Sequence, residues 1–356
     1  MADMRDADER RSGHVNTRAA SPRAAQEALT VAFGMPAFLL PLADRFLEPG
    51  DLSLISALAG GPLSTVEVLQ GLRALTCADL ERAHRRGILD WRGTGTEEVA
   101  LADFHARYEV WALFEGWKDV PDDIAERINE WELEEYAGSI GADLVAIREG
   151  RLAQGGEAAY TYLLLPEAEE LIGNQPRVYL WPCNCRAMYR RCRLPVNVCL
   201  RFENDRGLGW EISTERALEL LREADGAGLM HTAHAGAGAS EAHAVCNCCA
   251  DCCFPQMAAR LLDVADLWPT RRHRARVDAA ACTVCGRCAS RCPFGAFVVP
   301  RANHGGAGDA REVVASRPGA AEGKRRALLF SADECRGCGL CATGCPENAI
   351  VMESLS

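Results

Sequence analysis

With 356 residues, of which 48% are apolar, the chain is long enough for two or three domains with buried cores. Its net charge of −11 argues against non-specific nucleic-acid binding, which requires an excess of Lys and Arg on one face. The sequence has no apolar run of the ~18 residues needed to cross a bilayer, and residues 1–25 mix both charges instead of forming an export signal. We therefore expect a cytoplasmic protein with no membrane span, and a disordered tail over residues 1–25.

Residues 26–155 have the pattern of a helical domain. Ser64 with Glu67, and Thr76 with Asp79, form the capping pattern of two successive helices. Residues 88–104 then alternate apolar and polar side chains around the turn signal Gly93–Thr94–Gly95, which predicts a β-hairpin. Two helices followed by a hairpin resemble a winged helix, a fold that either binds DNA or packs against protein.

The charge of this region favours protein contact over DNA. Four basic residues would lie on or near the second helix: Arg82, His84, Arg85 and Arg86. Between residues 61 and 101, however, five arginines face six acidic residues, so the electrostatic footprint of a DNA-binding domain is missing. A redox-responsive winged-helix regulator is therefore an alternative and not the main hypothesis.

Cysteine is concentrated in the second half of the chain. The sequence has eighteen cysteines, and only Cys77 precedes Cys183. In a long chain without an export signal, so many thiols favour metal binding over a disulfide framework. The Gly-rich residues 154–159 precede an apolar strand-like segment, so we expect a domain boundary near 155–175.

Residues 176–270 form a predicted cysteine-rich α/β domain that binds metal. Its nine cysteines lie in two patches: Cys183, Cys185, Cys192 and Cys199, then Cys246, Cys248, Cys249, Cys252 and Cys253. Between the patches, a helix capped by Ser213 and ending at Gly226 or Gly228 is expected to precede a strand, which would return the chain so that the patches meet. Five arginines make the first patch electropositive and favour thiolates: Arg186, Arg190, Arg191, Arg193 and Arg201.

Residues 277–354 contain two runs with the spacing C-x2-C-x2-C-x3-C, each followed by proline. The first run is Cys282, Cys285, Cys288 and Cys292, and the second is Cys335, Cys338, Cys341 and Cys345. This spacing resembles the bacterial dicluster ferredoxin family. The resemblance implies a ferredoxin-like module with two [4Fe–4S] clusters and crossed ligation, in which the fourth cysteine of each run binds the other cluster. Cys282, Cys285, Cys288 and Cys345 would hold one cluster, and Cys292, Cys335, Cys338 and Cys341 the other. The polar, Gly-rich residues 300–326 predict a mobile surface insertion.

The middle cysteine pattern resembles a segment found upstream of dicluster ferredoxin modules in larger iron–sulfur proteins of poorly defined role. Thiolate-rich sites beside cluster ligands in a reduced cytosol most often hold further clusters, which favours one or two additional [4Fe–4S] clusters in this domain. Structural zinc, or a redox-active dithiol at Cys248–Cys249 or Cys252–Cys253, remains open. The C-x-C and C-x2-C spacings favour four thiols as ligands of a common metal: Cys183, Cys185, Cys246 and Cys249. We do not expect His231, His234 or His243 to be ligands.

The expected architecture is α+β, with a helical, winged-helix-like region, a cysteine-rich α/β domain and a ferredoxin-like dicluster module. Clusters with complete cysteine ligation have no open iron, which favours outer-sphere electron transfer over catalysis. We expect an electron carrier or oxidoreductase subunit whose partner is a flavoprotein, an oxidoreductase or a ferredoxin-dependent enzyme. A reductase that acts at the middle cysteine site is a further alternative. The sequence has no P-loop or G-x-G-x-x-G fingerprint for a nucleotide.

Overall fold

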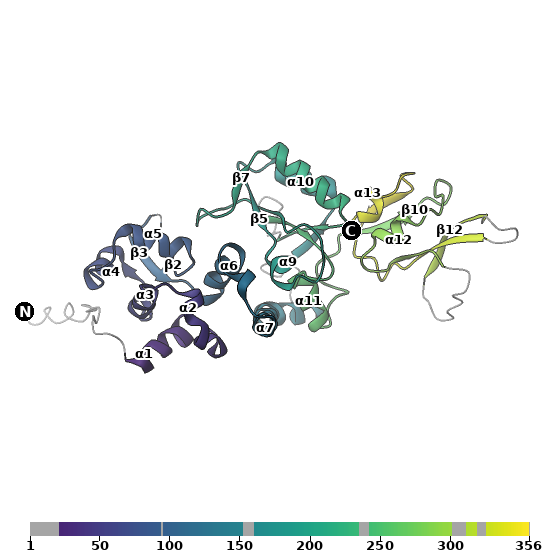
Figure 1. The fold of residues 1–356 in the computed structure, drawn as a ribbon. Coiled ribbons are helices and arrows are strands. Elements are labelled where there is room, and N and C mark those ends of the chain that lie inside the picture. Colours follow the sequence, from purple (N-terminus) through teal and green to yellow (C-terminus); the bar gives the residue numbers. More distant parts are fainter. Residues whose placement is uncertain are drawn as a thin grey trace, which may run out of the picture. The chain divides into compact units, whose positions relative to one another are not determined.

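A computed structural model describes residues 21–93, 95–151, 160–234, 242–300, 311–318 and 325–355. Helices and sheets are mixed, as expected for an α+β chain (Figure 1). The chain divides into two compact units. One comprises Met1–Val120 with Asp205–Leu208, and the other comprises Pro121–Asn204 with Gly209–Ser356.

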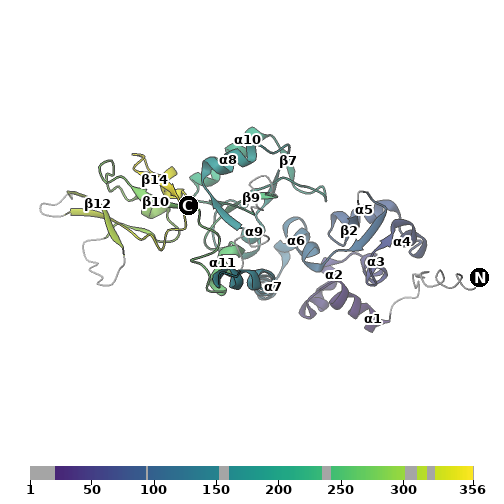
Figure 2. The same cartoon turned by 180° about the vertical axis from the view of Figure 1, so that it is seen from behind.

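This division corrects the domain boundary expected near 155–175. Helix α7 (Asp122–Arg148) belongs to the second unit, although the sequence placed it in the first. The reason is its apolar face, where Ala137, Ile140 and Leu144 pack in one buried cluster with Trp268. Figures 1 and 2 both show α7 beside α11 (Phe254–Leu261), which contributes to the same cluster. The Gly-rich residues 154–159 lie outside the described part of the chain.

The first unit begins with a helix inside the expected tail. Residues 1–20 are outside the described ranges, but α1 starts at Pro22, where Ser21 caps it by accepting a hydrogen bond from the Ala24 N–H. Four short helices open the unit: α1 (Pro22–Glu27), η1 (Ala28–Ala32), η2 (Ala37–Leu42) and α2 (Ala43–Phe46). Across the residues described, no single helix is long and apolar enough to span a bilayer; one pair, Pro22–Ala32 with Ala37–Phe46, passes that test only jointly and is bent by 119°.

The capping and hairpin predictions are confirmed in the rest of the unit. Capping boxes start α4 (Thr65–Gly71) at Ser64 and α5 (Cys77–Arg85) at Thr76. The remaining elements are α3 (Asp51–Leu58), β1 (Leu63–Ser64), β2 (Leu89–Arg92), β3 (Glu98–Leu101), α6 (Phe104–Phe114) and η3 (Trp117–Asp119). The strands form an antiparallel sheet in the order β1-β3-β2. Its hairpin turn includes Thr94, which is not among the described residues, and assignment to the winged-helix family stays a prediction.

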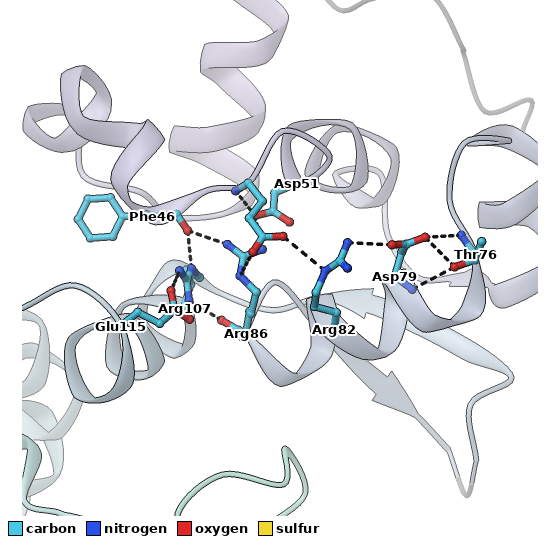
Figure 3. A network of polar contacts seen from close by, with 9 residues as sticks. Phe46, Asp51, Thr76, Asp79, Arg82, Arg86, Arg107 and Glu115 are labelled. Carbon is cyan, nitrogen blue, oxygen red and sulfur yellow. Dashed lines mark hydrogen bonds and ion pairs between the residues drawn. The ribbon is translucent and has the colours of Figure 1, made fainter.

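A buried arginine network holds the first unit together (Figure 3). Arg107 is 0% exposed and donates to the carbonyl oxygens of Phe46 and Arg86 and to the Glu115 carboxylate. Arg86 in turn lies 2.7 Å from an Asp51 carboxylate oxygen, and the Asp51 side chain is also buried. A buried guanidinium is stable only when its donors and its charge are matched in this way.

Glu115→Ala should therefore destabilise the unit strongly. It leaves the Arg107 charge buried without a carboxylate, which typically costs about 3–5 kcal/mol of unfolding free energy. Arg82→Ala is the matched control, because the Arg82 side chain is 61% exposed and its loss costs about 0–1 kcal/mol. Urea unfolding followed by tryptophan fluorescence measures both. Equal effects of the two substitutions would contradict the proposed role of the buried network.

The second unit is built on a six-stranded antiparallel sheet with the order β4-β8-β9-β6-β5-β7. Its strands are β4 (Tyr160–Leu163), β5 (Val178–Pro182), β6 (Asn197–Arg201), β7 (Trp210–Ile212), β8 (Met230–His234) and β9 (Ala244–Cys248). Helix α10 (Thr214–Gly226) starts after the predicted cap Ser213, ends at Gly226 and precedes β8, as the sequence predicted.

The two faces of this sheet are covered by different helices. Helices α8 (Leu165–Gly173) and α10 pack side by side on one face (Figure 2). Leu200 of β6 and Val245 of β9 point toward them. Because side chains alternate along a strand, Cys199 and Cys246 project to the opposite face. That face carries α7, α9 (Asn184–Tyr189) and α11 (Figure 1).

The C-terminal part of the unit contains the two cysteine runs. Strand β10 (His273–Val277) pairs with β14 (Ile350–Ser354), and β11 (Phe297–Val298), β13 (Arg325–Phe330) and β12 (Glu312–Pro318) form a second sheet. The expectation of a mobile insertion over 300–326 is wrong for residues 312–318. These residues form β12, because Ala315 is buried against the module's core. Residues 301–310 and 319–324 are outside the description.

Candidate metal centres

Each C-terminal cysteine run is a loop that leads into a short helix, α12 (Arg287–Arg291) or α13 (Leu340–Thr343). Both helices follow a glycine with a left-handed backbone, Gly286 at φ 84° and Gly339 at φ 80°. Gly337 of the second loop has φ 74°, and a Cβ there would lie 2.2 Å from the His273 carbonyl oxygen. Glycine is therefore required where this loop curls against the backbone.

The first loop encloses a cavity with the thiols of four cysteines. Cys282, Cys285, Cys288 and Cys345 line an empty volume of about 330 Å³ whose surface is almost entirely apolar. The second cavity, of about 290 Å³, is lined by Cys292, Cys335, Cys338 and Cys341. In each case the fourth cysteine comes from the other run, so the structure groups the thiols in the crossed arrangement that the dicluster resemblance implies.

The donor set of these cavities fits iron–sulfur clusters. Four thiols surround each one, and burial raises the pKa of Cys288 to about 11 and that of Cys338 to about 12. Without metal the Cys288 and Cys338 thiols hold their protons. Loading must release those protons, because the thiolate is the ligand and only a metal's charge compensates burying it.

Residues 281–350 match the family model of the 4Fe-4S dicluster domain. The match covers both cysteine runs and supports iron–sulfur clusters in this part of the chain. Comparison with curated proteins found no match, and comparison with solved structures found none either.

All eighteen cysteines are thiols in this structure, with no disulfide among them. The nine middle cysteines separate into two groups. Six of them are neighbours that shift one another's pKa in succession, and we call this group the six-thiol ring: Cys183, Cys185, Cys253, Cys248, Cys246 and Cys199. The three that remain, which we call the thiol trio, are Cys192, Cys249 and Cys252, with all sulfur atoms within 4.8 Å of one another.

The sheet explains how the six-thiol ring forms. Pairing of β5 with β6 places Cys199 opposite Trp181, two residues before Cys183, and pairing of β6 with β9 brings Cys246 alongside. Cys246 and Cys248 share a face because they are two residues apart on β9. Hydrogen bonds from neighbouring thiols, above all from Cys185 and Cys246 respectively, lower the pKa of Cys183 and of Cys248.

Two members of the thiol trio, Cys249 and Cys252, lie where the chain turns after β9, and Cys192 follows α9. The Cys192 sulfur is 3.7 Å from that of Cys249 and 3.8 Å from that of Cys252. Hydrogen bonding by the Cys252 thiol lowers the pKa of Cys249 to about 5, and the Cys252 and Asp251 N–H groups and the Arg186 charge act in the same direction. These contacts favour the thiolate form of Cys249.

The structure separates Cys249 from the other three thiols that the spacing favoured as ligands of one metal. Cys183, Cys185 and Cys246 are in the six-thiol ring, whereas Cys249 is in the trio. The reason is again strand alternation, because Cys249 follows Cys248 directly where β9 ends. The sequence contained this signal, since C-x-C on a strand predicts a shared face and adjacent cysteines do not.

Arg186 interacts with both thiol groups. Its side chain is 1% exposed, with Nη1 donating to the Pro195 carbonyl and Nη2 to the Asn247 carbonyl at 2.8 Å. Its Nε has no hydrogen-bond partner among the described atoms. Burial lowers its pKa, but the thiolates of Cys183, Cys249 and Cys199 raise it above the ordinary value overall. The sequence marked Arg186 only as one of five basic residues, yet it is the buried counter-charge of the site.

The histidines that the sequence left out of the site have other contacts. His231 is buried on β8, with its Nδ1 atom 2.6 Å from the side-chain oxygen of Asn247. His243 is exposed and lies 3.3 Å from Glu203. The side chain of His234 is not described.

One hydrophobic cluster joins the six-thiol ring to the second C-terminal cavity. Tyr162, Met230 and Leu340 are buried in it together with Cys248 and Cys253 of the ring. Cys338, which lines the second cavity, and Phe294 pack against the same cluster. The Tyr162 ring meets Phe294 edge to face at 6.0 Å, and its hydroxyl accepts a hydrogen bond from Gln256. Nothing in the sequence pattern pointed to Tyr162.

Proposed function

We propose that this chain is an iron–sulfur electron-transfer protein in which two C-terminal [4Fe–4S] clusters exchange electrons with at least one further cluster at the six-thiol ring. The observation that carries the proposal is one buried cluster in which Tyr162 and Leu340 pack with Cys248 and Cys253 of the ring and with Cys338 of the second cavity. Tunnelling rates fall steeply with distance, so contact through one layer of side chains provides an efficient path. The ring supplies more thiols than the four a [4Fe–4S] cluster takes.

The entry point in this proposal is the first C-terminal cluster. Cys285 is exposed, whereas Cys338 faces the interior of the unit. A redox partner such as a flavoprotein, oxidoreductase or ferredoxin-dependent enzyme would dock over Cys285, and electrons would move inward through the second cluster. We place this exchange in the cytoplasm, where the thiol pool keeps such cysteines reduced.

The contacts of α5 give no support to the regulator alternative. Arg82 pairs with Asp79 and Glu48, and Arg86 pairs with Asp51 and Glu48 (Figure 3). Phosphate contacts would have to compete with these carboxylates. A reductase acting in the middle domain is favoured by one observation, the thiol trio, which offers a bound metal only three protein ligands among the described residues.

Tyr162→Leu should slow electron transfer between the C-terminal clusters and the ring severalfold, because it removes the aromatic side chain that fills the space between them. Tyr162→Phe is the control, since it keeps the aromatic contact with Phe294 and loses only the hydroxyl group. The measurement is freeze-quench EPR after mixing the oxidised chain with reduced flavodoxin as electron donor. Simultaneous reduction of all clusters in the Leu variant would refute the path through Tyr162.

A further inference from the structure

Two separate segments of the chain bring the thiol trio together. Cys249 and Cys252 form a C-x2-C pair in the turn after β9, and Cys192 reaches them from the segment between α9 and β6. The Cys192 sulfur lies 3.7 Å from the Cys249 sulfur and 3.8 Å from the Cys252 sulfur, and all three lie within 4.8 Å of one another. A C-x2-C pair completed by a more distant cysteine is a common ligand pattern of zinc sites.

The spacing of the three sulfurs fits a single metal ion. A zinc ion binds thiolates at about 2.3 Å in tetrahedral geometry, which places any two of its sulfur ligands about 3.8 Å apart. Both distances from the Cys192 sulfur match that value. A [4Fe–4S] cube is a larger object that holds its thiolates farther apart, so the trio is too compact for a cluster.

Backbone N–H groups prepare two of the sulfurs for metal binding. The Cys252 N–H donates to the Cys249 sulfur at 3.3 Å, and the Asp251 N–H donates to the same sulfur. The Arg191 N–H donates to the Cys252 sulfur. Hydrogen bonds of this kind stabilise the thiolate, which is the form of cysteine that binds metal. The turn after β9 therefore holds its C-x2-C pair in a preformed arrangement.

The charges around the trio suit a zinc–thiolate centre. A dipositive ion with three thiolates keeps a net negative charge, which is costly to bury without a partner. Arg186 is 1% exposed, and its guanidinium interacts with Cys249. On the solvent side, Arg191 and Arg193 flank Cys192 and are exposed. Positive charge thus lies both behind the trio and at its entrance.

The described side chains supply three ligands to such an ion and not four. Among the described residues, no further Cys, His, Asp or Glu places a ligand atom within 4.8 Å of all three sulfurs. Cys192 is only half-buried, so the trio lies where solvent can approach it. Three protein ligands and one solvent molecule are the arrangement of catalytic zinc sites, whereas structural zinc sites have four protein ligands.

We infer that Cys192, Cys249 and Cys252 bind one zinc ion through three thiolates, with a fourth position that holds water and is open to a thiol from solution. A given set of ligands binds Zn²⁺ more tightly than Fe²⁺, which favours zinc here. A thiol that binds displaces the water and releases its proton to solvent, because a zinc-bound thiol is deprotonated. The site is separate from the iron–sulfur centres of the proposed function, does not depend on them, and adds a Lewis acid to the chain.

The first test is zinc-edge X-ray absorption on the full chain, purified without oxygen and without added thiol. This method detects only zinc, so iron at the other centres does not contribute. The wild type should contain about one zinc per chain, with three sulfur ligands at about 2.3 Å and one oxygen or nitrogen at about 2.0 Å. A chain without zinc, or zinc with four sulfur ligands, would overturn the inference.

Two alanine variants locate the ion. Cys192→Ala removes one of three thiolates and should lower the zinc content about tenfold or more, because metal affinity depends on the number of deprotonated ligands. Cys199→Ala, the matched control in the six-thiol ring, should retain about one zinc per chain. If Cys192→Ala kept its zinc, or if both variants lost it equally, the trio would not be a separate zinc site.

The last test adds 2-mercaptoethanol to the wild type as a thiol probe. The zinc-edge spectrum should change from three sulfur ligands to four, because the probe replaces the water in the fourth position. Cys199→Ala should respond in the same way. A coordination shell that the probe leaves unchanged would refute the open position.

Discussion

Cys288→Ala and Cys345→Ala should abolish the EPR signal of the same [4Fe–4S] cluster, although the two residues belong to different cysteine runs. Both thiols line the first cavity with Cys282 and Cys285, so removal of either leaves one iron of that cluster without its ligand. Each variant should lose up to about four irons per chain, or retain a cluster converted to a three-iron form.

The second cavity provides the matched control. Cys292→Ala and Cys338→Ala should affect the other cluster and spare the first, because these two thiols line the second cavity. Anaerobic EPR redox titration of the four variants measures the pairing. If the single variants Cys288→Ala and Cys292→Ala lost the same cluster, each run would bind its own cluster. That result would contradict the crossed arrangement.

Arg186→Met should remove metal from the middle domain and leave the C-terminal clusters in place. The substitution keeps a long apolar side chain but deletes the buried cation that interacts with Cys183, Cys199 and Cys249. Several thiolates would then be buried without a counter-charge, which costs about 3–5 kcal/mol when one partner of a buried pair is lost. Iron content, sulfide content and EPR should show the loss.

Arg186→Lys is the control for this variant. It retains the positive charge but cannot reproduce the two guanidinium bonds to the Pro195 and Asn247 carbonyls. We expect intermediate iron content at the middle centres. Full metal content in Arg186→Met would show that the guanidinium is not required as the counter-charge.

Local chemistry was predictable where one short segment contains the whole signal. The capping boxes at Ser64 and Thr76, the cap at Ser213 and the C-x2-C-x2-C-x3-C runs each depend on residues close in sequence. The extent of the second unit was harder to predict, because the apolar face of α7 packs against residues more than a hundred positions away, around Trp268. No periodicity in α7 itself assigns it to one unit or the other.

The division of the middle cysteines could be predicted only in part. Strand alternation indicates that Cys246 and Cys248 share a face and that Cys249 does not. Closure of the six-thiol ring also needs the pairing of β5, β6 and β9, which brings together residues from three separate strands. No single segment of the sequence determines the strand order, so the thiols next to Cys199 could be identified only from the structure.

The central claim is that the chain contains iron–sulfur centres beyond the two C-terminal clusters. Anaerobic iron and sulfide analysis with EPR tests it most directly, on the full chain and on a double variant that removes one ligand of each C-terminal cluster, Cys338→Ala/Cys345→Ala. The account predicts clearly more than the about eight irons that two [4Fe–4S] clusters hold, and a brown double variant that still has the EPR signal of a reduced [4Fe–4S] cluster, which three-iron remnants of the C-terminal clusters do not give. About eight irons in the wild type, with a colourless double variant, would contradict it.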